Sequence, residues 1–239
     1  MKKSLLLLAL VASFSAAAQS AAQPAAVASV VPVLTATAAA PASYTELMTA
    51  TIAELNSTGN PAQLRQLAST FERAAAVATT DWLPQYYQAY ALLLNVFQSK
   101  ETGDVKDKTL DQAEAALGRA RKLAGNESEL LTLQAYIYQA RLGISPMQRS
   151  QQYSGMVNQT LAIAKALSPT NPRVYLVQAN NLYYTPEMFG GGAAVAKSMY
   201  DEALSRFVAF KPASALAPSW GERQLRDRLK AYEQPSASK

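Results

Sequence analysis

The 239-residue sequence contains no cysteine and no histidine, and these two absences exclude more than any other feature of its composition. Without cysteine there is no disulfide, thiolate nucleophile or thiolate-bound metal, and without histidine the commonest general base and the usual zinc ligand are missing. Zincins, Ser-His-Asp hydrolases and Cys-His proteases are therefore excluded. No G-x-S-x-G or S-x-x-K motif is present either.

A carboxylate pair, as in glycosidases, is the catalytic arrangement that these absences leave open. The sequence has 17 acidic residues, and no two of them stand out as such a pair. We therefore expect a non-catalytic protein, with no catalytic residues, no cofactor and no metal site.

The N-terminus has the parts of a secretory signal peptide. Two lysines follow the initiating methionine, residues 4–14 form an apolar stretch of 11 residues, and small residues come next. Spanning a bilayer takes about 20 apolar residues, so this stretch is too short for a membrane anchor. Without cysteine the chain cannot carry the lipid of a lipoprotein. We predict a signal peptide over residues 1–18, export across the inner membrane to the periplasm, and no integral membrane span after cleavage.

The composition beyond the signal peptide predicts one folded domain with unstructured ends. Residues 19–43 are rich in alanine, contain three prolines and have no charged residue, which is typical of a disordered leader. Residues 234–239 are predicted to form a disordered tail. The folded domain is therefore expected over residues 44–233.

The charge of the chain gives no indication of a nucleic-acid partner. The net charge of +5 includes the two lysines of the signal peptide and falls to +3 without them. The other basic residues are scattered, and only Arg119, Arg121 and Lys122 lie close together, as on the solvent-exposed face of a helix. A nucleic-acid surface would need a basic patch or stripe.

An internal repeat is visible in two series of residues that keep the same spacing. The first series places the same Gln-Ala pair at offsets of 46 and 44, in Gln88-Ala89-Tyr90, Gln134-Ala135-Tyr136 and Gln178-Ala179-Asn180. The second series has an internal spacing of 4 and then 3 residues, with offsets of 46, 44 and 43; it comprises Leu67/Phe71/Ala74, Ala113/Leu117/Ala120, Val157/Leu161/Ala164 and Tyr200/Leu204/Phe207. Spacings of 3 and 4 place residues on one face of a helix, so each repeat is predicted to contain two helices.

Residues that favour the start or the end of a helix give the positions of these helices. Asn60-Pro61 and Asn171-Pro172 each put a capping side chain before a proline at the first helical position. We predict helices over residues 44–56, 61–78, 82–98, 109–124, 127–142, 149–167, 172–184, 193–209 and 220–233, with no strand. The fold class is therefore all-α, with about four helical hairpins stacked as a solenoid and a C-terminal capping helix. Trp220, on that last helix, is expected to cover the exposed end of the stack.

The repeat resembles the tetratricopeptide (TPR) motif over roughly residues 60–212. Ala89, Ala135 and Ala179 stand where that family has a small residue on the first helix, and the spaced triads match its second-helix positions. Two departures are clear: the family repeats every 34 residues, whereas this chain repeats every 43 to 46, and the last triad is bulky. Other helical-hairpin solenoids with longer repeats are the structural alternative.

The surplus residues of each repeat are predicted to lie between its two helices. Residues 99–108, 143–149 and 185–192 would then form a contiguous rim of loops, which is either a binding face or a set of tolerated insertions. Four large side chains lie just before and within the third loop, ahead of its three glycines: Tyr183, Tyr184, Met188 and Phe189. Either these side chains face a ligand, or Met188 and Phe189 fold under the array.

Two other patterns carry less weight. Residues 191–198 read GGAAVAKS, one residue away from a phosphate-binding loop, but a helix rather than a strand is predicted before them, so nucleotide binding is rejected. Asp104, Asp107 and Asp111, with Glu101, lack the ligand spacing of an EF-hand loop, and a solvated charge cluster is the preferred interpretation.

The resemblance implies that the first helices line a concave groove, here polar and aromatic. Together with the residues next to the three glycines, which come from the loop and not from the resemblance, this gives as partner-binding candidates Tyr86, Tyr90, Gln134, Tyr136, Gln178, Asn181, Tyr183, Tyr184, Glu187 and Phe189. The function expected is an exported, non-catalytic scaffold for a protein or peptide partner in the cell envelope, of undetermined oligomeric state. The alternative is a small-ligand or glycan-binding component of an envelope transport system. A scaffold predicts an open groove, and a ligand carrier predicts an enclosed pocket near residues 183–189.

Overall fold

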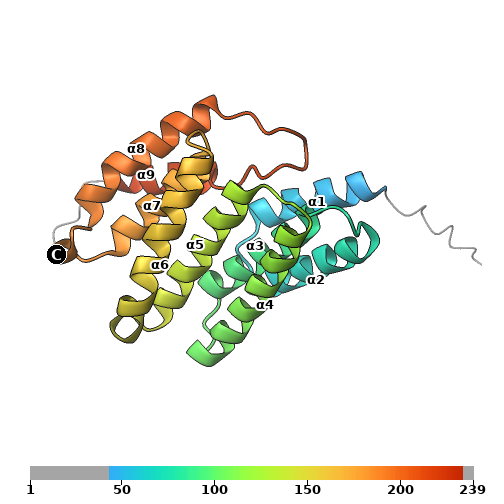
Figure 1. Ribbon diagram of the computed structural model, residues 1–239, viewed down its shortest axis with the longest axis horizontal. Helices are drawn as coiled ribbons and strands as arrows, with labels where there is room; N and C mark the ends of the chain where they lie inside the picture. The colour runs from blue at the N-terminus through green and yellow to red at the C-terminus, as the bar shows by residue number, and fades with distance from the viewer. Residues whose placement is uncertain (1–42, 234–239) are drawn as a thin grey trace, which may run out of the picture. The chain divides into compact units, whose positions relative to one another are not determined.

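The computed structural model describes residues 43–233, which form nine α-helices and one short 3₁₀ helix, without a strand (Figure 1). The helices are α1 (Tyr44–Ser57), α2 (Pro61–Val77), α3 (Leu83–Gln98), α4 (Gly103–Lys122), α5 (Glu127–Ile144), α6 (Pro146–Leu167), α7 (Pro172–Tyr184), α8 (Ala193–Ala209) and α9 (Glu222–Glu233), with η1 (Glu187–Phe189) between α7 and α8. The all-α prediction is confirmed for this part of the chain. The predicted signal peptide, the C-terminal tail and all but the last residue of the predicted leader lie outside it.

Asparagine side chains begin several helices, as the sequence predicts. The Asn60 side-chain oxygen accepts a hydrogen bond from the amide of Ala62 at 2.8 Å, and that of Asn171 accepts one from the amide of Arg173 at 3.0 Å. Each satisfies a backbone donor that has no partner within its helix, and the following proline has no such donor to satisfy. The sequence therefore identifies the starts of α2 and α7 correctly.

The helices pair along the chain, and the first helices of successive pairs also meet. Close packing joins α3 to α4, α5 to α6 and α7 to α8, while α2 packs on α3 (Figure 1). Contacts also run from α3 to α5 and from α5 to α7, so these three helices form an inner row. Residues one repeat apart bond within that row: Glu129 to Arg173, 44 positions away, and Asn180 to Tyr136, also 44 positions apart.

The alanines of the first repeated series and nearly all of the second series lie in the hydrophobic core. Ala89, Ala135 and Ala179 are completely buried on the inner row, where a small side chain allows neighbouring helices to approach closely. The triads of α2, α4 and α6 are also buried, and in the bulky triad of α8 only Leu204 remains partly exposed. The spacing in the sequence therefore marks residues that pack between helices.

The predicted rim of three loops is wrong for its first two members. Helix α4 begins at Gly103, six residues earlier than predicted, and only Ser145 separates α5 from α6. The extra length of these repeats is therefore mostly additional helix. Only the connection at residues 185–192 remains a loop of appreciable length, and it contains η1.

Ion pairs between the extended helix ends explain why these segments are helical. The Arg141 guanidinium of α5 lies 3.2 Å from a carboxylate oxygen of Asp107, 2.6 Å from Asp111 and 2.6 Å from Glu114, all on α4. Arg149 of α6 binds Asp107 at 2.6 Å. The predicted solvated cluster is therefore wrong for Asp107, which is paired with two arginines and has only 24% of its side chain exposed, whereas Asp111 pairs with Arg141 and still has 68% of its side chain exposed to solvent, as predicted.

Asp107 makes this cluster sensitive to acid. The Arg149 guanidinium, with a further contribution from Arg141, holds the pKa of the Asp107 carboxyl below its ordinary value of 3.8. Because the folded-state pKa is depressed, the stabilisation is present above pH 3.8 and is lost as the pH falls through the folded-state pKa. We expect Asp107→Asn to lower the free energy of unfolding by about 1–2 kcal/mol at pH 7, and the difference from wild type to shrink below pH 4.

Urea unfolding at pH 7 and pH 3 measures this difference. Asp227→Asn is the matched control, because Asp227 is exposed and contacts only Lys230 of its own helix, at 3.4 Å. An equal loss of stability for Asp107→Asn at both pH values would contradict the proposed role of the ionised carboxylate.

Candidate functional site

Aromatic side chains are concentrated on one face of the inner row, which we call the aromatic face. It comprises Tyr86, Tyr87, Tyr90 and Phe97 of α3, Tyr136 of α5, and Tyr183 and Tyr184 of α7. Neighbouring rings are in contact: the centroids of Tyr86 and Tyr87 are 5.4 Å apart, and those of Phe97 and Tyr136 are 5.0 Å apart. The aromatic face therefore extends over three helices.

The chain's own C-terminal segment lies across this face. We call residues 210–233 the C-terminal cover; it consists of a non-helical loop, residues 210–221, followed by α9 (Figure 1). The indole ring of Trp220 is nearly parallel to the Tyr90 ring, with centroids 4.5 Å apart, and to the Tyr136 ring, at 6.1 Å. Its ring nitrogen donates a hydrogen bond to the Tyr86 hydroxyl at 2.7 Å.

Tyrosine hydroxyls supply most of the other bonds to the cover. The Tyr87 hydroxyl donates to the Leu216 carbonyl at 3.0 Å, and the Gln224 amide donates to the Tyr136 hydroxyl at 2.9 Å. Arg228 donates to the Tyr184 hydroxyl at 3.0 Å, and its guanidinium lies 4.3 Å from the centre of the Tyr183 ring. The cover is thus held along the aromatic face by hydrogen bonds to tyrosine hydroxyls and by stacking on tyrosine rings.

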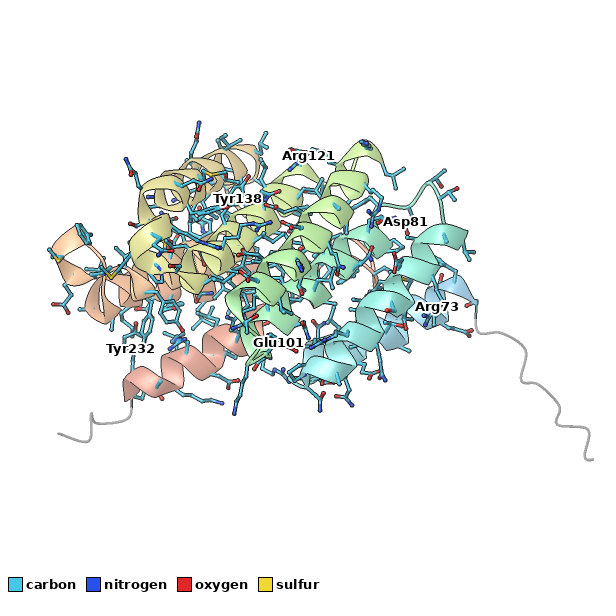
Figure 2. All side chains as sticks on the ribbon, turned by 90° about the horizontal axis from the view of Figure 1, so that it is seen from below. Arg73, Asp81, Glu101, Arg121, Tyr138 and Tyr232 are labelled. Atoms are coloured by element: carbon cyan, nitrogen blue, oxygen red, sulfur yellow. The ribbon has the colours of Figure 1, made fainter. Side chains whose placement is uncertain are left out.

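Tyr232 attaches the end of α9. Figure 2 shows it on α9, on the side of that helix that faces the rest of the described domain. Its hydroxyl donates to the Ala193 carbonyl at the start of α8, at 2.8 Å, and its ring packs edge-on against Tyr183 and Tyr200.

This arrangement changes the expected groove and the expected role of Trp220. Tyr86, Tyr90 and Tyr136 are buried, so in this structure they face the cover and no open groove is present at these positions. Trp220 is buried, as predicted, but it precedes α9 and lies on the inner faces of α3 and α5 rather than at the end of the stack. The predicted end cap is therefore wrong in its location.

Two of the three polar candidates, Gln134 and Asn181, bond to a neighbouring hairpin. The Gln134 amide of α5 donates to Glu114 of α4 at 2.9 Å, and the Asn181 amide of α7 donates to Asn158 of α6 at 3.2 Å. Gln178 is half-buried on α7. A role in partner binding stays a prediction for these three side chains.

A buried ion pair lies beneath the cover. Arg173 and Glu129 are both buried, with nitrogen–oxygen distances of 2.5 to 3.0 Å, and the Tyr86 hydroxyl donates to the same carboxylate at 3.1 Å. Burial, together with the negative charge of Glu129, raises the pKa of Tyr86 well above its ordinary value of 10.0, so its hydroxyl remains a donor. The guanidinium is 4.6 Å from the Phe210 ring and 5.9 Å from the Trp220 ring.

The connection between α7 and α8 carries exposed apolar side chains. Tyr184, Met188 and Phe189, which we call the loop patch, are exposed to 72%, 82% and 71%. Glu187 beside them is also exposed. The alternative in which Met188 and Phe189 fold under the array is therefore wrong. Gly190 and Gly192 have φ values of 81° and 99°, the left-handed backbone that the three glycines make possible.

Two hollows on the surface of the described residues lie away from the loop patch. One of about 300 Å³ is lined by Thr170, Arg206, Ala209, Phe210 and Lys211. The other, of about 430 Å³, is lined by Arg65, Gln66, Ser69, Thr70 and Arg73 of α2. Neither is the enclosed pocket that a ligand carrier was expected to have near residues 183–189. Among the described helices, none is both long and apolar enough to cross a bilayer.

The fold and this site define a class of protein: an all-helical array of hairpins with an aromatic inner face closed by its own C-terminal segment. The solved structure of the HusA haemophore from Porphyromonas gingivalis is similar to this chain, with 36% sequence identity and a TM-score of 0.71, over 82% of this chain and 97% of that one. The chain belongs to the HusA haemophore family. No protein-family model and no curated protein matches it, and the resemblance to the TPR family stays a prediction.

Proposed function

We propose that this chain binds haem or a related porphyrin outside the cytoplasm, as a haemophore. The observation that carries the proposal is the 36% identity to the HusA haemophore over nearly the whole of that protein. It favours the ligand-binding alternative over the scaffold, and the cover on the aromatic face also speaks against a scaffold with an open groove. The signal peptide predicted over residues 1–18 agrees with action in the periplasm or beyond it.

The loop patch has the chemistry that a porphyrin requires. A porphyrin such as haem is a flat apolar ring that carries carboxylates, so it binds to aromatic surfaces next to cations. Tyr184, Met188 and Phe189 offer exposed apolar area, and Arg228 is fixed beside them by its bond to the Tyr184 hydroxyl. Within residues 43–233 no carboxylate forms an ion pair with Arg228, which leaves its charge for a ligand.

The composition limits the side chains that could bind the haem iron. Without histidine and cysteine, tyrosine and methionine are the remaining familiar iron ligands. Tyr184 and Met188 belong to the loop patch. Tyr184→Phe keeps the ring but removes the oxygen, so weaker binding of haem, with unchanged binding of iron-free protoporphyrin, would assign that oxygen to the iron.

Titration of the mature protein with haem, followed by Soret absorbance, tests the proposed function. We expect saturable binding, and Tyr184→Ala/Phe189→Ala is expected to weaken it roughly tenfold or more, because two aromatic contacts are lost. Met147→Ala is the matched control, since Met147 is 96% exposed on α6 and lies outside the loop patch. Absence of haem binding by the wild-type protein would refute the function, whereas equal binding by the double variant would move the site away from the loop patch.

A further inference from the structure

We propose that the C-terminal cover opens as one unit in the free protein while α1 to α8 remain folded. Opening would expose the aromatic face and the Arg173–Glu129 ion pair. The proposal goes beyond haem binding and does not depend on it, because it concerns the chain without a ligand. Three features of the contact between the cover and the inner row support it.

The first feature is the small amount of core that the cover contributes. Across the whole cover only Pro218, Trp220 and Leu225 are buried, and of these only Leu225 lies on α9, whereas α3 alone has eleven buried residues. Of the other helices, only α8 packs extensively against α9. Because regions with few buried apolar contacts open at the lowest free energy, the cover is the natural candidate for partial unfolding.

The second feature is the polarity of the surface beneath the cover. The hydroxyls of Tyr86, Tyr87, Tyr136 and Tyr184 each bond to a group on the cover. In an open state these hydroxyls can bond to water instead. The inner row does not depend on α9 for its packing, since α3, α5 and α7 contact one another and their own hairpin partners. An open state would therefore leave the hairpins intact.

The third feature is a buried polar atom, Nη1 of Arg173, that destabilises the closed state. Among residues 43–233, Nη1 of Arg173 is buried and has no hydrogen-bond partner, while Phe210 and Trp220 of the cover lie against the same guanidinium. A buried donor that bonds to nothing destabilises the state that contains it. Opening would bring water to Nη1, so this part of the closed state favours release of the cover.

Hydrogen exchange of the native, ligand-free protein in low concentrations of urea tests the proposal. We expect the amides of α9 and the indole N–H of Trp220 to give one common free energy of opening, once each is corrected for its intrinsic exchange rate, with a weak dependence on urea. The opening equilibrium constant should be at least about 100-fold larger than that of the slowest amides of α3 and α5. Gln224→Ala removes the bond to Tyr136 and is expected to speed this exchange roughly two- to tenfold.

Arg226→Ala is the matched control for that variant. Arg226 is on the same helix and bonds only to Glu222, also on α9, so opening should proceed as in wild type. The proposal is overturned if α9 has the protection and urea dependence of α5, because the cover would then leave only in global unfolding. It is equally overturned if the Trp220 indole exchanges with α3 rather than with α9.

Discussion

Replacing Glu129 by glutamine is expected to lower the free energy of unfolding by about 3–5 kcal/mol, although the two side chains have nearly the same shape. The substitution leaves the Arg173 charge buried, with 1% of its side chain exposed and no counter-ion beneath the cover. Removing one partner of a buried pair is costly because the remaining charge has lost its hydration and no longer has an opposite charge to compensate for that loss. Equilibrium unfolding in urea, followed by circular dichroism at constant pH, measures the loss.

The double variant Glu129→Leu/Arg173→Met separates the two possible reasons for such a loss. If the ion pair only compensates for its own burial, two apolar side chains of similar size should restore most of the stability. A double variant as unstable as Glu129→Gln would instead show that the hydrogen bond from Tyr86 or the packing of Phe210 depends on the charges. A loss below about 1 kcal/mol for Glu129→Gln would contradict the buried pair itself.

The fold was predictable because its core repeats. Ala89, Ala135 and Ala179 keep their spacing since each occupies the same contact between neighbouring helices, and a larger side chain would separate them. The repeat also contains the information needed to predict the Glu129–Arg173 ion pair. Glu129 and Arg173 both stand six residues before an alanine of that series, so they occupy equivalent positions of stacked repeats.

The helix ends could not be predicted in the same way. Gly103 and Pro146 look like breakers in the sequence, yet both stand in the first turn of a helix, where proline is tolerated and glycine costs little. What extends these helices is tertiary: the ion pairs of Arg141 and Arg149 with Asp107 join three helices. Local sequence contains no trace of a partner more than 30 positions away.

The candidate site was only half visible in the sequence. The inner-row tyrosines were identified as a group, but their partners lie on the cover, and the loop at residues 210–221 has no periodicity that would place it. Tyr86 and Trp220 are 134 positions apart and still form a hydrogen bond. A tyrosine that faces a ligand and one that faces a distant segment of its own chain have the same pattern in sequence, so burial by the cover could not be foreseen.

Trp220→Ala is expected to lower the free energy of unfolding by about 3–5 kcal/mol, the range for truncating a buried aromatic side chain. The variant loses the stacking on Tyr90 and Tyr136 and leaves the Tyr86 hydroxyl without its donor. In the closed state the variant has an indole-sized space beneath the cover, so millimolar free indole is expected to bind there, favour closure and restore part of the lost stability, as ligands do in engineered cavities. Thermal unfolding with and without indole measures both effects.

Trp82→Ala is the comparison for that experiment, because Trp82 is only partly buried and meets Tyr86 edge-on, so a smaller loss and no rescue by indole are expected. The size of the Trp220→Ala loss also bears on the cover. If the cover is a separate unit, this loss cannot exceed the free energy of opening measured by hydrogen exchange, since a fully weakened cover simply detaches. A larger loss would mean that Trp220 also stabilises the helices beneath it, and a loss below about 1 kcal/mol would mean that the indole does not hold the cover closed.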